Sequence, residues 1–182
     1  MSELLEALYR GEDDRVAELM AAGPELDAFE AAAVGHTENL RRLLDDDPDL
    51  AAAWAADGFT PLHLAAFFQH PDAARLLVER GAPIDAVARN AEIAVTPLQS
   101  AVTAGDEETA ALLLERGADP NFRHGGGFTP LQTAAHRGSE RLVGLLLSHG
   151  GDRTLADDAG RTPAAYARDA GHEALAARLE AD

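Results

Sequence analysis

The chain has 182 residues, of which 46% are hydrophobic, and it carries a formal net charge of −17 with no cysteine. This length allows one domain with a sizeable core. The absence of cysteine excludes disulfide bonds and thiolate chemistry. A chain this acidic lacks the basic face that nucleic-acid phosphates require, and anionic membranes repel it for the same reason.

The sequence shows neither a membrane span nor a secretory leader. No apolar run approaches the roughly 18 residues of a membrane-spanning helix. The opening segment, MSELLEALYRGEDD, lacks the basic start and long apolar stretch of a signal peptide. We therefore expect a cytoplasmic protein.

The charge is distributed unevenly along the chain. Residues 1–58 hold fifteen acidic residues and four arginines, a balance of −11. Residues 120–168 hold four acidic residues and six arginines, a balance of +2. This asymmetry favours steering of a basic partner toward the N-terminal part. The alternative is that the acidic residues form a solvated surface and serve solubility alone.

One short segment recurs along the chain. FTPLHLAA at 59–66 returns as VTPLQSAV at 95–102, FTPLQTAA at 128–135 and RTPAAYAR at 161–168, so the Thr-Pro pairs lie 36, 33 and 33 residues apart. A second marker keeps the same register, namely the turn after each first helix, which falls on Gly11, Gly35, Gln69, Gly105, Gly138 and Gly171. A period near 33 residues predicts a stacked repeat array.

We divide the chain into six units that form a single domain, 1–182, with the first and last units shortened. Their approximate bounds are 1–26, 27–56, 57–92, 93–125, 126–158 and 159–182. Only the segment GPELD joins the first unit to the second, which is too short for the connector found elsewhere. The start of the second unit, DAFEAAAVGH, keeps the alanines but lacks Thr-Pro-Leu.

Each full unit has the pattern of two helices joined by a tight turn. In the third unit, Thr60 can cap a helix with its hydroxyl, and Pro61 suits the first helical position, where no amide hydrogen is needed. A second helix is predicted from about Asp72 to Arg80, with Gly81 ending it in the left-handed conformation. Acidic residues at the starts of the second helices match the helix dipole, so we assign them no chemistry.

These features resemble the ankyrin repeat family over essentially the whole chain. The matching segments are DGFTPLHLAA, ARLLVERGAPIDA, TAALLLERGADPN and RLVGLLLSHGGDR. The resemblance implies an all-α solenoid of about six antiparallel helix pairs, with hairpin fingers at the junctions and shortened caps as the first and last units. It also implies that the inner helices and fingers form a concave surface that binds another protein. We expect a monomer.

Two features of the later units depart from the family pattern. The usual His after Thr-Pro-Leu stands only at His63, with Gln99 and Gln132 in its place further along. Glutamine still offers both a hydrogen-bond donor and an acceptor. The 36-residue step adds three residues to the connector 82–95. We therefore predict a longer finger around Asn90 to Ile93.

No catalytic or metal-binding constellation emerges from the motifs. The chain has no His-Glu-x-x-His helix, the glycines of HGGG at 124–127 fit turns, and the acidic run 45–49 lacks the spacing and central Gly of a calcium loop. We predict no catalytic residue, metal site or cofactor. Because a Ser-His-Asp triad needs no adjacency in sequence, a small-molecule or metal-dependent enzyme on an atypical solenoid remains the alternative function.

The repeat register predicts which residues face a partner. In ankyrin-like units the two residues before the turn lie on the concave side, and the residue before each Thr lies on a finger. The third unit and its finger thereby gather four aromatic residues, and the later units add arginines. Aromatic residues beside arginine are typical of interface hot spots. The predicted partner-binding residues are Trp54, Phe59, Phe67, Phe68, Val95, Thr103, Arg123, Phe128, His136, Arg137 and Arg161.

Phe67 and Phe68 are adjacent on one helix, where neighbours point about 100° apart. We therefore expect one to pack against the neighbouring inner helix and the other to face solvent and bind, with Phe68 as the binder. The alternative for Phe67 is packing against Ala33 and Val34. Because Phe128 also precedes Thr-Pro-Leu, an aromatic residue there can instead be a structural feature of the repeat.

Overall fold

The computed structural model describes residues 1–90 and 93–181. In that part of the chain the regular structure is helical, and strand-like pairing is limited to one bridge between His124 and Phe128. The helices are α1 Glu3–Arg10, α2 Asp13–Ala21, α3 Ala28–Ala33, α4 Thr37–Asp46, α5 Pro61–Phe67, α6 Pro71–Glu79, α7 Pro97–Ala104, α8 Glu107–Glu115, α9 Pro130–Arg137, α10 Glu140–Ser148, α11 Pro163–Asp169 and α12 Glu173–Glu180, with short 3-10 helices at Pro48–Ala52 and Gly125–Gly127. The predicted all-α fold is confirmed.

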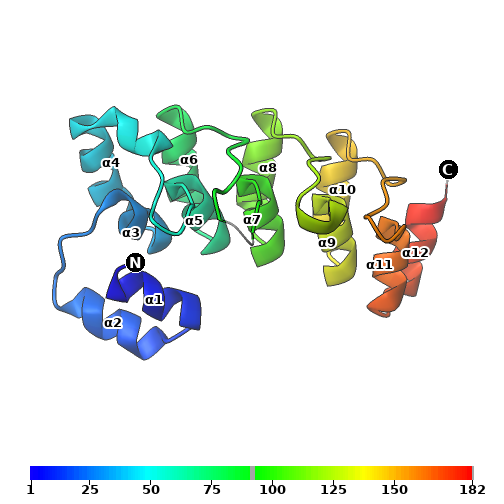
Figure 1. Cartoon of the computed structure of the whole chain (residues 1–182), viewed down its shortest axis with the longest axis horizontal. Helices are drawn as coiled ribbons and strands as arrows, with labels where there is room; N and C mark the ends of the chain where they lie inside the picture. Colours follow the sequence, from blue (N-terminus) through cyan, green and yellow to red (C-terminus); the bar gives the residue numbers. More distant parts are fainter. Residues whose placement is uncertain (91–92, 182) are drawn as a thin grey trace.

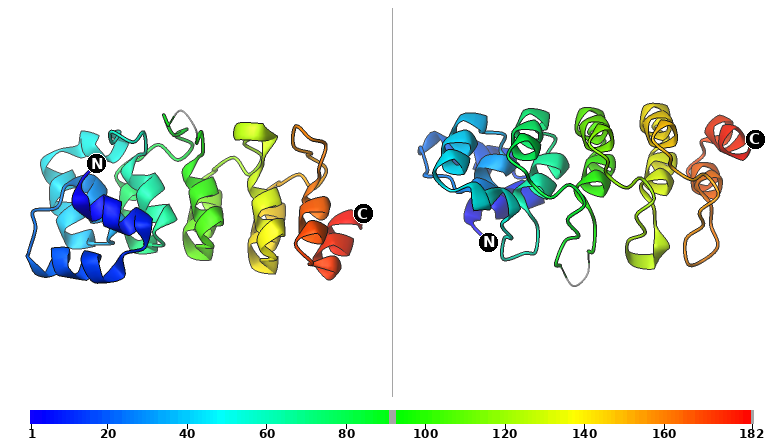
Figure 2. Two further views of the ribbon diagram at one scale, coloured as in Figure 1. Left: turned by 60° about the horizontal axis from the view of Figure 1, so that its bottom comes forward. Right: turned by 90° about the horizontal axis from the view of Figure 1, so that it is seen from above.

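Five of the helix pairs, α3–α4 to α11–α12, stand side by side in one row (Figure 1). Helices α3, α5, α7, α9 and α11 form the inner layer, each packing on the next, and α4, α6, α8 and α10 pack in the same way in the outer layer. The connecting fingers project on the side of the inner helices (Figure 2). This is the predicted solenoid of helix pairs. None of the described helices is long and apolar enough to cross a membrane.

The Thr-Pro pairs begin the inner helices as predicted. The hydroxyl oxygen of Thr60 accepts a hydrogen bond from the backbone N–H of His63, and Pro61 takes the first helical position. Thr96 and Thr162 cap α7 and α11 in the same way. The small residues that follow are fully buried, which lets neighbouring helices approach closely; they include Ala65, Ala66, Ala101, Ala134 and Ala135.

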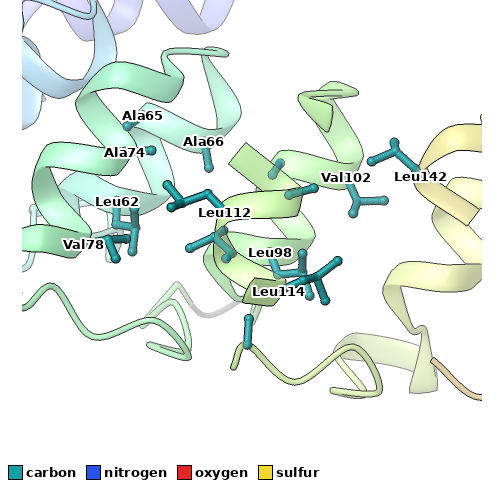
Figure 3. Close-up of a cluster of buried hydrophobic side chains, with 14 of the residues drawn as sticks. Leu62, Ala65, Ala66, Ala74, Val78, Leu98, Val102, Leu112, Leu114 and Leu142 are labelled. Atoms are coloured by element: carbon teal, nitrogen blue, oxygen red, sulfur yellow. The ribbon is translucent and has the colours of Figure 1, made fainter. Parts of the chain in front are cut away.

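The hydrophobic core is a continuous seam between neighbouring units. Figure 3 shows part of it, from Leu62 and Ala66 in the third unit through Leu98 and Val102 in the fourth to Leu142 in the fifth, all of them buried. No unit encloses a core of its own. The stability of each unit therefore depends on its neighbours, as in other linear repeat arrays.

The first helix pair does not extend the row. Helix α1 lies crosswise, against the lower ends of α3 and α5 in Figure 1 and in front of them in the left view of Figure 2, and α2 packs on α1. The short joining segment contains no finger, as GPELD indicated. Leu4, Leu5 and Ala7 of α1 are buried, whereas α2 buries none of its residues. The first unit is thus shortened, as predicted, but it lies across the inner-helix face rather than at the end of the row.

The finger before α7 is hydrogen-bonded to the preceding finger. The backbone N–H of Arg89 donates to the carbonyl of Gly58 at 2.8 Å, and the Asn90 side chain donates to the carbonyl of Asp57 at 3.1 Å. Across the finger, Ala88 N–H donates to the carbonyl of Val95 at 2.8 Å. The predicted longer tip, Asn90 to Ile93, lies in part outside the described residues, which omit 91 and 92.

All six predicted turn positions adopt a positive φ angle, including the one that is not glycine. Gln69 has φ 61° and is the only non-glycine residue with a positive φ among residues 1–90 and 93–181. Its side-chain amide donates to the carbonyl of Ala104 at 2.8 Å, a bond to the next unit that glycine cannot make. At Gln69, backbone strain therefore lowers the stability of the fold, and the inter-unit hydrogen bond raises it.

Two substitutions at Gln69 separate these effects. Gln69→Ala removes the hydrogen bond and keeps the strained backbone, whereas Gln69→Gly removes both. Because a left-handed residue with a Cβ costs roughly 1–2 kcal/mol, we expect Gln69→Gly to be the more stable variant by about 1 kcal/mol. Urea unfolding followed by circular dichroism measures the difference. Equal unfolding free energies would show that the turn carries no strain.

Candidate functional site

Three exposed apolar side chains from separate segments converge on the inner-helix face. Tyr9 of α1, Phe67 of α5 and Ile93 of the finger are 38%, 40% and 48% exposed, and they make up three of the five large apolar residues exposed in the described chain. Together they line a cavity of about 270 Å³, which we call the apolar pocket. Its remaining walls are Phe59, His63, Leu64, Val95, Ser100 and Thr103.

Phe67 and Phe68 divide their roles, but in the opposite sense to the prediction. Phe67 is the exposed residue and lines the pocket. Phe68 caps the end of α5, is half-buried, and packs against a small cluster made by Leu5, Ala33 and Leu64. The assignment of Phe68 as the open member of the pair is therefore wrong. The reason is α1, which lies over this helix end and is too distant in sequence to have been placed there.

Tyr9 belongs to the site although it was not among the predicted contacts. Its ring centroid lies 6.3 Å from that of Phe67 and 5.4 Å from that of Phe68. Its hydroxyl donates to a carboxylate oxygen of Asp57 at 3.3 Å. Partial burial of the side chain, reinforced by that carboxylate, raises the pKa of Tyr9 well above its usual value. In sequence, Tyr9 occupies the register position before the Gly11 turn, which was the one signal for it.

His63 forms a wall of the pocket and ties it to the finger. The side chain is 1% exposed. Its Nδ1 accepts a hydrogen bond from Thr60 N–H at 3.2 Å, which leaves the proton on Nε2 to donate to the carbonyl of Val95 at 3.0 Å. Burial lowers the pKa of His63 to about 4. A neutral imidazole thus holds the Val95 wall against α5.

The pocket offers shape and apolar surface rather than a reactive group. Among the described residues, its ionisable walls are Tyr9 and His63. Both ring nitrogens of His63 are engaged, and the raised pKa of Tyr9 keeps its hydroxyl protonated at neutral pH. Neither can act as a general base there. Among the described residues, no three His, Asp or Glu side chains come together as a candidate metal site.

Several other predicted contact residues hold neighbouring units together. Trp54 is half-buried, and the guanidinium of Arg89 lies 4.1 Å from its ring centroid. Arg123 donates hydrogen bonds to the following finger. Arg137 donates to the backbone carbonyl of Thr103, in the preceding unit, at 2.8 Å. None of these three side chains lines the apolar pocket, so their role in binding stays a prediction.

The last predicted contacts gather around Tyr166 in the final units. The ring centroid of Phe128 lies 5.6 Å from that of Tyr166, His136 lies 6.3 Å away, and the Arg161 guanidinium lies 4.4 Å from the ring. The Tyr166 hydroxyl donates to a buried carboxylate oxygen of Asp157 at 2.7 Å. Burial, with help from this bond, raises the pKa of Tyr166 to about 12. Phe128 is half-buried and packs against this cluster, in line with the structural alternative considered for it.

His63 makes stability depend on pH in a way that one substitution tests. The folded pKa of about 4 lies below the ordinary 6.5, so the unfolded chain takes up the proton first as pH falls. The stability contributed by neutral His63 is complete above pH 6.5 and is lost progressively between pH 6.5 and 4. That loss amounts to roughly 3 kcal/mol.

We expect His63→Gln to remove this acid-induced loss. Glutamine stands at the same position in Gln99 and Gln132, so the repeat accepts it. Burial also lowers the pKa values of His70 and His124. Their contributions to the pH dependence of stability are the same in the unaltered chain and in His63→Gln. The difference between their unfolding free energies, measured from pH 7 to pH 4, therefore isolates His63. Parallel pH profiles would contradict the assignment.

Comparison with known proteins confirms the resemblance drawn from the repeats. The family model for three copies of ankyrin repeats matches residues 4–90, 28–124 and 98–180. The chain is 33% identical over 102 residues (56% of its length) to ankyrin repeat and SAM domain-containing protein 6 of Mus musculus, covering 11% of that protein. It is 44% identical over 82 residues (45%) to protein PhlB of Serratia liquefaciens, covering 35% of it. It is 42% identical over 86 residues (47%) to human neurogenic locus notch homolog protein 4, covering 4% of it.

These matches cover only a minor part of each relative, so they identify the repeat architecture and not a shared activity. The family model, in contrast, spans nearly all of the chain. This protein belongs to the ankyrin repeat family.

Proposed function

We propose that this protein binds a partner protein through its inner helices and fingers, with the apolar pocket as the anchoring point. Ankyrin repeats generally serve as protein–protein interaction modules. The observation that carries the proposal is the convergence of Tyr9, Phe67 and Ile93, which come from three segments and remain exposed around one cavity. Exposed apolar side chains that gather in this way are typical of interaction sites, whereas scattered ones need no explanation.

The size of the pocket favours an apolar side chain as its occupant. Its volume is about 270 Å³, which lies below the range of roughly 300–1,000 Å³ typical of small-molecule sites. One or two side chains of a partner fill such a space. Because the walls formed by described residues also supply no free acid or base, this proposal is better supported than the alternative of a small-molecule or metal-dependent enzyme.

We further propose that the partner is basic around its apolar anchor. The acidic excess lies in residues 1–58, which include α1 and the finger that carries Asp57. The first turns of α1 and α2 present the exposed acidic residues Glu3, Glu6, Asp13 and Asp14. The partner, in this proposal, meets a monomeric cytoplasmic protein and contacts neither nucleic acid nor membrane.

Alanine substitutions of the two phenylalanines test the anchor. We expect Phe67→Ala to fold with nearly unchanged stability and to lose about 2 kcal/mol of binding free energy, because its side chain is exposed at the pocket. We expect Phe68→Ala to lower stability by roughly 2 kcal/mol or more, because its side chain packs under α1. Melting curves and titrations with a partner captured from the native host measure both quantities.

Val87→Ala is the matched control, because Val87 is an exposed apolar finger residue, 37% accessible, that does not line the pocket. It should leave both stability and affinity unchanged. Full affinity in Phe67→Ala would show that the partner does not use the apolar pocket.

The charge proposal predicts how association depends on salt. Because screening weakens long-range attraction between exposed charges, the association rate with the captured partner should fall as ionic strength rises, while dissociation changes little. Biosensor measurements from low to high salt give both rates. An association rate independent of salt would mean that the acidic residues serve solubility rather than steering.

A further inference from the structure

We propose that α1 is a built-in occupant of the partner-binding surface, and that a partner displaces it with an amphipathic helix of its own. This inference rests on the proposed function, because it concerns how the same surface is controlled. In the structure α1 lies on the inner-helix face as a bound helix would, with its apolar side turned toward α3 and α5. The partner would then bind the surface that α1 now covers.

The contacts of α1 identify the covered surface. Leu5 forms a buried cluster with Ala33 of α3 and Leu64 of α5. The half-buried side chains packed around this cluster are Leu8, Phe29, Phe59 and Phe68. Phe59 and Phe68 are two of the residues that the sequence predicts as partner contacts. The chain's own helix thus fills part of the site from which the repeat register expects a partner to bind.

The apolar pocket is the uncovered end of a longer groove. Tyr9, the penultimate residue of α1, supplies one wall of the pocket, and Phe59 and Leu64 belong both to the pocket and to the cluster under α1. Removal of α1 would therefore join the pocket to the surface around Phe68. The enlarged groove would include the area now covered by α1, a helix of eight residues, and would therefore suit a helix rather than a single side chain.

The joining segment lets the first pair move as a unit. Residues 22–25 are exposed, and Gly23 has a positive φ of 67°. Just beyond them, the chain is fixed by a hydrogen bond from the Asn39 side chain to the carbonyl of Leu26 at 3.0 Å. Asp27 and Glu30 then form a capping box that starts α3 without help from the preceding residues. The row can therefore keep its first helix when α1 leaves.

The two ends of the chain differ in how firmly they are held. At the C-terminal end, α12 buries Leu175, Ala176 and Leu179, and Arg178 bonds to Glu140 of the preceding unit at 3.0 Å. At the N-terminal end, α2 buries no residue. The apolar residues of α2 are only half-buried where they pack against the core. The first pair is thus held by fewer fully buried side chains than the last pair, which makes it the end that opens at the lower cost.

The residues of α1 indicate which side chains a competing partner helix needs. Its buried and half-buried apolar residues are Leu4, Leu5, Ala7 and Leu8, followed by Tyr9 at the rim, while Glu3 and Glu6 face solvent. A competing helix needs the same apolar spacing, since the groove that it enters is shaped by those side chains. A hydrogen-bond donor in the place of Tyr9 would meet the carboxylate of Asp57.

A labelled peptide of residues 1–23 tests the displacement without any partner. We measure its binding to the full chain and to the full-length variant Leu5→Ala by fluorescence polarisation. Leu5→Ala weakens docking of the helix within the chain and leaves every groove residue intact. Because the groove is then open for a larger fraction of the time, the peptide should bind this variant about tenfold more tightly or better.

Matched controls fix the interpretation. Glu6→Ala changes the solvent face of α1, so the peptide should bind this variant as weakly as the unaltered chain. A peptide carrying Leu5→Ala and Leu8→Ala should bind none of the proteins. Equal binding of the unaltered peptide to the parent chain and to Leu5→Ala, or no binding to either, would overturn the proposal.

Hydrogen exchange of the unaltered chain gives a second test, which holds even if Leu5→Ala fails to fold. The amides of α1 should exchange about tenfold faster than those of α7 or more, since α1 opens without the row. Exchange of α1 at the rate of α7 would overturn the proposal. Neither assay involves a partner, so their outcome is separate from the Phe67→Ala titration, whose failure would count against the proposed function alone.

Discussion

The constraint on which this structure depends is that each helix pair can bury its apolar face only against the next pair. Leu62, Leu98 and Leu131 occupy equivalent positions and are each completely buried, although no single unit surrounds them. Close contact requires the alanines that follow, because a larger side chain there would push the helices apart. This packing sets the spacing of the fingers, of the inner-helix face and of the pocket.

The same constraint explains why the first helix pair lies where it does. A regular unit uses a finger to bring the next pair into line, and the short segment before α3 contains none. Leu4, Leu5 and Leu8 still need apolar neighbours, and the inner-helix face beside α3 and α5 supplies them. The outcome is a pair that packs on the face of the array.

The sequence predicted those features of the fold that depend on local chemistry. A Thr-Pro pair such as Thr60 and Pro61 predicts a helix start at each of its positions in the chain. A tight turn requires glycine or, at Gln69, a residue that tolerates the left-handed conformation. The period then placed the units, the inner layer and the fingers. These predictions succeed because each depends on a few adjacent residues and is repeated along the chain.

The candidate site was predicted only in part, because its geometry depends on contacts between distant segments. The register correctly placed Phe67 on the inner-helix face. It could not show that α1 would cover Phe68, or that Tyr9 would stand beside a helix more than fifty residues later in the chain. In the same way, the sequence alone predicts Trp54 as an exposed anchor. In the structure, Arg89 from the next finger lies over its ring.

The apolar pocket straddles a junction between units, and this has a mechanical consequence. Phe67 belongs to the third unit and Thr103 to the fourth, so these two walls are carried by neighbouring units that meet along one packed seam. A change in the curvature of the array at that seam widens or narrows the cavity directly. A contact far along the row that bends the array therefore changes the shape of the pocket. This effect requires no chain of interacting side chains between the contact and the pocket.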